Sequence, residues 1–103
     1  MEEEANLATF LFWKLSIILT TIQKCRTIVT KEIKKIPLKI SERELIKQAK
    51  EIIRAIKKDL AELDEKIKKL ENVSIREYFE KLRKRCLEEL NELEEICSVF
   101  KIL

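Results

Sequence analysis

Residues 36–79, IPLKISERELIKQAKEIIRAIKKDLAELDEKIKKLENVSIREYF, decide the fold because they contain one proline and two similar helix starts. Pro37 has no backbone N–H and disfavours helical geometry in the residue before it, so a helix arriving from the N-terminus ends by Ile36. The segments SERE at 41–44 and SIRE at 74–77 each match a capping box, in which a serine caps the helix and a glutamate reaches back. These starts divide the chain into three helical segments.

Flanking residues refine these boundaries. Ile40 and Leu45 occupy the positions of a hydrophobic staple across the first start. Val73 and Tyr78 occupy the same positions across the second start. Asn72 is expected to end the second helix in the left-handed conformation, because the chain has no glycine to take that place. The predicted helices cover about residues 5–36, 42–71 and 75–100.

Apolar residues recur along each segment at spacings that alternate mostly between three and four. The stripes are Leu11, Leu15, Ile18, Ile22, Cys25, Val29, Ile33 and Ile36; Leu45, Ala49, Ile52, Ile56, Leu60, Leu63, Ile67 and Leu70, widened by Ile46 and Ile53; and Ile75, Phe79, Leu82, Cys86, Leu90, Leu93, Cys97 and Phe100. This spacing predicts coiled-coil-like packing, and the two short connections make successive helices antiparallel. We expect one domain over residues 1–103, an all-α, elongated, antiparallel three-helix bundle.

The composition argues against catalysis. The chain has no glycine, which disfavours phosphate-binding loops and tight hairpins, and no histidine, the commonest general base and metal ligand. The acidic run 88–95 could supply carboxylates to a di-metal site, but it avoids the core stripe, whereas such ligands point inward. We therefore expect no enzyme, no metal site and no cofactor.

The three cysteines all fall on apolar stripes, where a thiol packs as a small hydrophobe. Cys25 and Cys97 lie at nearly the same height in helices that run parallel, so a disulfide between them is geometrically allowed. Cys86 lies about 16 Å lower by helical rise and should stay free. Three reduced thiols are the favoured interpretation, and the disulfide is the alternative. Abundant Lys, Glu and Ile with only five Asn and Gln residues favour a hyperthermophile, in which intracellular disulfides occur, although an AT-rich genome gives a similar bias.

The first half of the first predicted helix is apolar nearly all round. Phe10, Trp13 and Ile17 lie on a second side beyond the core stripe, and Phe12 and Leu19 lie on a third. Such a helix needs cover on every side, and two neighbouring helices cover only one. We therefore expect a non-catalytic protein–protein interaction or assembly module that forms a homo-oligomer or binds a partner protein through these five residues.

Nucleic-acid binding is the second interpretation. The stretch 24–39 contains six basic residues and only one acidic residue, and four more basic residues follow in the second predicted helix. They are Lys24, Arg26, Lys31, Lys34, Lys35 and Lys39, then Lys47, Lys50, Arg54 and Lys57. Such stripes can track phosphates, as in an accessory subunit of a nucleic-acid complex. The net charge is only +3, and the acidic run 88–95 is expected at the same end, where it would neutralise much of the basic half.

Membrane association is the third interpretation. The stretch Leu7–Ile22 is apolar, but its sixteen residues are fewer than the roughly 20 that span a bilayer. Lys14 lies in its middle, where a charge costs about 2.5–3.5 kcal/mol on insertion scales. The acidic start differs from the basic start of a secretory signal, so we expect a cytoplasmic protein.

Overall fold

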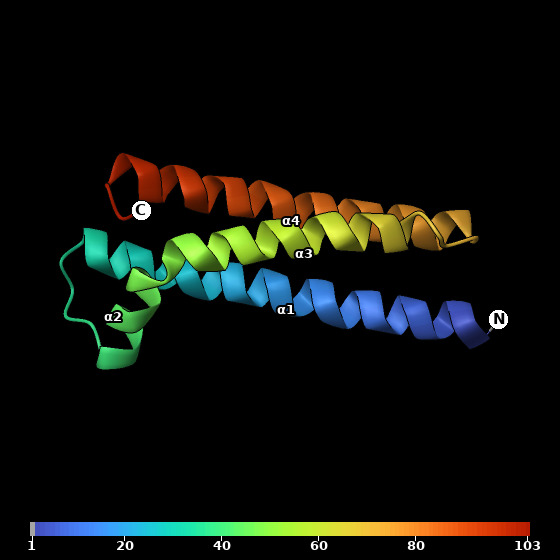
Figure 1. The fold of residues 1–103 in the computed structure, drawn as a ribbon, viewed down its shortest axis with the longest axis horizontal. Helices are drawn as coiled ribbons and strands as arrows, with labels where there is room; N and C mark the ends of the chain where they lie inside the picture. Colours follow the sequence, from blue (N-terminus) through green and yellow to red (C-terminus); the bar gives the residue numbers. More distant parts are fainter. Residues whose placement is uncertain (1) are drawn as a thin grey trace.

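The structure is a computed structural model that describes residues 2–103. Those residues are all-helical and form a rod of 51 × 23 × 18 Å. The helices are α1 (Glu2–Ile33), α2 (Ile40–Lys47), α3 (Ala49–Ile67) and α4 (Val73–Val99). Figure 1 shows α1, α3 and α4 side by side along the rod, with α1 and α4 running in one direction and α3 in the other. The expected all-α, elongated architecture is confirmed at this level.

The second predicted helix is two helices, which corrects the expected count of three. Gln48 interrupts it with φ −95° and ψ 1°, and its N–H lies 3.1 Å from the carbonyl oxygens of both Glu44 and Leu45. The preceding short helix, α2, turns across the end of the rod (Figure 1). In α3, Ile53 is buried, whereas Ile52 of the predicted stripe is only half-buried, because Ile53 keeps the four-and-three spacing of the buried residues.

Two lysines occupy the left-handed position that glycine usually takes after a helix. α1 ends at Ile33, three residues before the predicted end, and Lys35 has φ 58°. The Ile36 N–H donates to the Lys31 carbonyl at 2.9 Å, which closes a Schellman motif. Lys101 after α4 has φ 56° and closes the same motif. A non-glycine residue in this conformation costs about 1–2 kcal/mol.

Both predicted N-caps are wrong. α2 begins at Ile40, and the Glu42 carboxylate, instead of that of Glu44, accepts the Lys39 N–H at 2.9 Å. α4 begins at Val73 with Asn72 as its N-cap in place of Ser74. Asn72 has extended geometry, φ −71°, and its Oδ1 accepts the Ile75 N–H at 3.1 Å, so the expected left-handed conformation is also wrong.

A contact from the far end of the chain holds the α3–α4 connection. Glu4 Oε1 accepts the backbone N–H groups of Glu71 and Asn72 at 2.7 and 2.9 Å. Arg76 donates to the Leu70 carbonyl at 2.9 Å and so satisfies the end of α3. Asn72, the residue that caps α4, is thus itself bound by Glu4.

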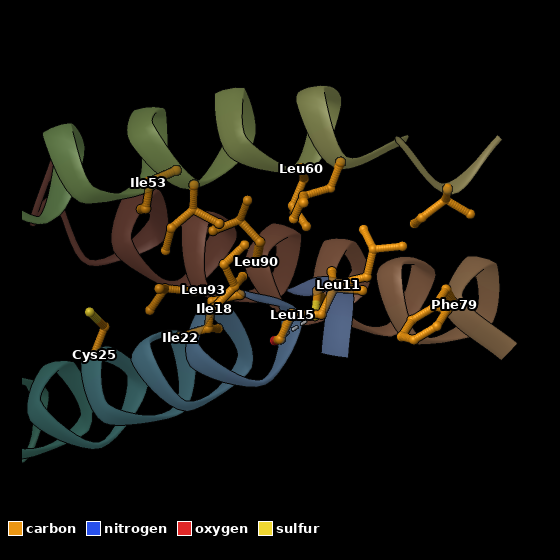
Figure 2. Packing of buried hydrophobic residues seen from close by; sticks show 14 of the residues in the cluster. Leu11, Leu15, Ile18, Ile22, Cys25, Ile53, Leu60, Phe79, Leu90 and Leu93 are labelled. Carbon is orange, nitrogen blue, oxygen red and sulfur yellow. Dashed lines mark hydrogen bonds between the residues drawn. The ribbon is translucent and has the colours of Figure 1, made fainter. Parts of the chain in front are cut away.

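The core lies where α1, α3 and α4 meet (Figure 2). Its buried members are Leu11, Leu15, Ile18, Ile22, Cys25 and Val29 of α1, Ile53, Ile56, Leu60, Leu63 and Ile67 of α3, Leu70 after it, and Phe79, Cys86, Leu90, Leu93 and Cys97 of α4. Burying one such leucine or isoleucine contributes about 1.5–3 kcal/mol. Ile36 and Phe100 of the predicted stripes are exposed, because both lie beyond the end of their helix.

Candidate interaction surface on α1

The outer face of α1 is the side of the N-terminal half that points away from α3 and α4. Phe12, Trp13 and Ile17 are 53, 58 and 45% exposed there. These three side chains line a shallow groove of about 500 Å³ together with four small polar residues, Thr9, Ser16, Thr20 and Thr21. Large apolar side chains and small hydroxyl residues thus share one uncovered surface, which we call the outer face.

The outer face carries few charged or polar groups that depend on hydrogen bonds to water. Lys14 is the only charged residue between Ala5 and Gln23, and it is half-buried. The Thr9 hydroxyl donates to the Ala5 carbonyl at 3.0 Å, and the Thr21 hydroxyl donates to the Ile17 carbonyl at 2.8 Å. Hydroxyls that bond back to the preceding turn of their own helix can be covered without losing a donor partner. At Thr9 and Thr21, cover by an apolar partner therefore carries little desolvation cost.

The five predicted interface residues do not all lie on the groove. Phe12, Trp13 and Ile17 line it. Phe10 lies at its edge, where the Lys66 Nζ of α3 is 5.7 Å from the ring centroid. Leu19 is half-buried against the core. The sequence interpretation did not include the groove's hydroxyl residues, because small polar residues on a helix face give no signal of a contact surface.

The short helix α2 covers the C-terminal part of the same side of α1. Ile28 follows Ile17 by about three helical turns and lies nearly in line with it, yet only 4% of it is exposed. The Lys31 Nζ lies 3.0 Å from the Glu42 Oε2 of α2. The outer face is therefore open from the start of α1 to about residue 27 and is closed beyond it by α2.

Two of the six basic residues predicted to contact nucleic acid form ion pairs within the chain. Arg26 pairs with Glu92 of α4 at 2.8 Å, and Lys31 pairs with Glu42. The other four have no ion-pair partner among residues 2–103; they are Lys24, Lys34, Lys35 and Lys39. From the acidic run, Glu94 pairs instead with Lys57 of α3 at 2.6 Å. Neutralisation of the basic half by the acidic run is therefore only partial.

All three cysteines are buried and carry free thiols. Burial raises the pKa of each thiol, and it raises the pKa of Cys86 to about 11. The Cys86 Sγ donates to the Leu15 carbonyl at 3.7 Å. Cys25 and Cys97 both belong to the buried core cluster, and their expected proximity stays a prediction. The disulfide between them stays a prediction.

Two further features bear on the alternative functions. α1 is long and apolar enough to cross a membrane by length and composition, since an 18-residue window in it has a mean hydropathy of 1.5. Only 22% of that window is buried. Residues 2–103 contain no group of three or more cysteine and carboxylate side chains that could hold a metal ion. In comparisons with known proteins, no family model, no curated protein and no solved structure matches this chain.

Proposed function

We propose that the protein is a non-catalytic interaction or assembly module that binds another protein chain through the outer face of α1. The observation that carries the proposal is the exposure of Phe12, Trp13 and Ile17 together on an uncharged groove. Tryptophan and other aromatic residues commonly anchor the centres of protein interfaces. Each of these side chains is about half exposed, so covering it would contribute about 1 kcal/mol from burial alone.

The rigidity of α1 supports the same function. α1 is a continuous helix of 32 residues, and its opposite side is fixed by core residues from Leu11 to Val29. A partner would therefore meet side chains on a preformed backbone, and binding would lose little conformational entropy from the chain itself. We propose that the long helices form a three-helix bundle that presents this surface.

Site-specific photo-crosslinking in the native cells tests the proposal. A photo-reactive residue at Thr20, on the outer face, should give a crosslinked species of higher mass. The same residue at Ala61, which is exposed on α3, serves as the control and should give none. The Thr20 product should disappear when Trp13→Glu is added. Absence of any product at Thr20, or equal products at both positions, would contradict the proposed function.

A nucleic-acid accessory role is a second candidate, favoured by the four basic residues that have no ion-pair partner among residues 2–103. Phosphate contacts give affinity that falls steeply as salt rises. The test measures binding of labelled duplex or single-stranded nucleic acid. Weaker binding by Lys34→Glu and Lys35→Glu, with unchanged binding by Lys58→Glu, would favour this role. Salt-insensitive or absent binding would remove it.

Membrane association through α1 is the third candidate, supported by the apolar window of that helix. Spanning a bilayer would require α1 to leave the core, because six of its residues are buried there. Flotation of the folded protein with liposomes tests this candidate. Recovery of the protein in the lipid-free fraction would rule it out.

A further inference from the structure

We propose that the partner of the outer face is a second copy of this chain, with the two α1 helices antiparallel and a two-fold axis crossing between Trp13 and Ser16. The inference rests on the proposed function and names its partner. It follows from three features that agree with one another: the spacing of residues along the face, the charges at its two ends, and the position of α2.

One line of residues along the outer face would face the second helix, with Trp13 as its apolar member. The residues of this line alternate at spacings of four and three; they are Glu2, Asn6, Thr9, Trp13, Ser16, Thr20, Gln23 and Thr27. This repeat keeps one seam of a helix facing a second helix over its whole length. Thr9 and Ser16, the neighbours of Trp13 on this line, are small, so two helices can approach closely there.

One flank of the seam is complementary to itself when it is reversed. Glu3, Phe10, Ile17 and Lys24 succeed one another at intervals of seven and therefore lie in one line along α1. In an antiparallel pair of α1 helices, Glu3 of each copy lies beside Lys24 of the other, and Phe10 of each copy lies beside Ile17 of the other. The two-fold axis makes each of these contacts occur twice. On the opposite flank, Phe12 meets Leu19 of the second copy in the same register. All five apolar residues predicted for the interface are thereby used.

The charges at the ends of this line select the antiparallel direction. Glu3 and Lys24 are exposed and have no ion-pair partner among the described residues, and about 32 Å of helix separates them. Antiparallel pairing places each Glu3 beside a Lys24 of the other copy. Parallel pairing would instead place the two lines on opposite sides of the seam, so neither Glu3 nor Lys24 would gain this partner.

The position of α2 limits the length of the contact. α2 covers α1 at Ile28 and Lys31, so the open face extends from Glu2 to about Thr27. In the antiparallel register, Glu2 of the second copy lies opposite Thr27, just before α2. Each copy therefore fills the open length of the other without meeting α2.

Charge reversal with rescue tests the pairing in the full chain. In analytical ultracentrifugation the wild type should be a dimer, and Lys24→Glu should raise the dimer Kd roughly tenfold or more, because two attractive pairs become repulsive. Adding Glu3→Lys to Lys24→Glu should restore the wild-type Kd. Lys58→Glu makes the same charge change on α3 and should have no effect. If the double variant does not regain the wild-type dimer Kd, the inference is overturned.

Cysteine crosslinking tests the direction independently. The three native thiols are buried, so they interfere little with introduced cysteines. Ser16→Cys lies near the proposed axis and should form a disulfide-linked dimer under mild oxidation. Gln23→Cys lies about 25 Å from its equivalent in the antiparallel register and should not. Crosslinking at both positions would show parallel pairing and overturn the inference.

The failure of this inference can be told apart from failure of the proposed function. A wild type that remains monomeric at every concentration, together with a Trp13-dependent crosslink from Thr20 to a different protein, would overturn only the second copy as partner. A monomer that gives no crosslink from Thr20 would overturn both.

Discussion

Replacing Lys35 by glycine should stabilise the protein. Lys35 has φ 58°, which costs a residue with a Cβ about 1–2 kcal/mol and costs glycine nothing comparable. Glycine also makes the unfolded chain more flexible, which offsets about 0.4–1 kcal/mol of the gain. The Lys35 side chain has no ion-pair partner among residues 2–103, so its loss should cost little. The free energy of unfolding should therefore rise by about 0.5–1 kcal/mol.

Urea denaturation followed by circular dichroism measures this change as a higher midpoint at unchanged slope. Lys35→Ala removes the same side chain but keeps the Cβ, so it should show no gain. Lys34→Gly is the matched control one residue earlier, where the N–H bonds to the Thr30 carbonyl in helical geometry at 3.0 Å. It should lose about 0.5–1 kcal/mol. If Lys35→Gly were destabilised as much as Lys34→Gly, the reasoning from the left-handed conformation would be refuted.

Three other changes test the remaining features. Glu4→Ala removes the two hydrogen bonds to loop N–H groups and should lower the free energy of unfolding by about 1–3 kcal/mol. Glu62→Ala, at an exposed carboxylate of α3 away from the proposed interface, is the control and should change it by less than about 0.5 kcal/mol. Cys86 has its pKa raised to about 11 by burial, so iodoacetamide at pH 8 should modify it only at the rate of unfolding; rapid labelling of the native protein would contradict its burial. The hydrogen bond from the Lys39 N–H, followed by the one from Lys31, lowers the pKa of Glu42 in the folded state. The contribution of Glu42 to stability is therefore present above its unfolded pKa of about 4.3 and is lost as the pH falls through its folded pKa. Glu42→Gln should make the urea midpoint depend less on pH in that acid range. If the pH dependence of the midpoint is unchanged, the assignment is disproved.

The apolar spacing predicted most of the core because burial is the strongest constraint on a helix face. Leu11, Leu15, Leu90 and Leu93 all lie where the three-and-four spacing places them. The break at Gln48 was not predictable in the same way, because no proline or glycine marks it. It occurs where α2 turns across the end of α1, and such packing between helices leaves no local signal.

The helix ends and the candidate surface show the same limit. The serine at 74 matches a capping pattern, yet Asn72 caps α4, and the Asn72 N–H is bound by Glu4 from a position about seventy residues away in the chain. The sequence did identify Phe12, Trp13 and Ile17 as surplus to the core. It did not show that α2 closes one end of their surface, because that depends on the break at Gln48.

The parallel arrangement of α1 and α4 has a consequence for synthesis. α1 makes its most extensive helix contacts with α4, the last helix to be made. At a ribosomal rate of about 5–20 residues per second, Leu90 is added roughly 4–16 s after Leu11. During those seconds the most apolar helix of the chain has left, or is leaving, the ribosome without its main neighbour. A nascent chain that stalls before α4 should therefore be a substrate for chaperones, whereas the finished chain should release from them.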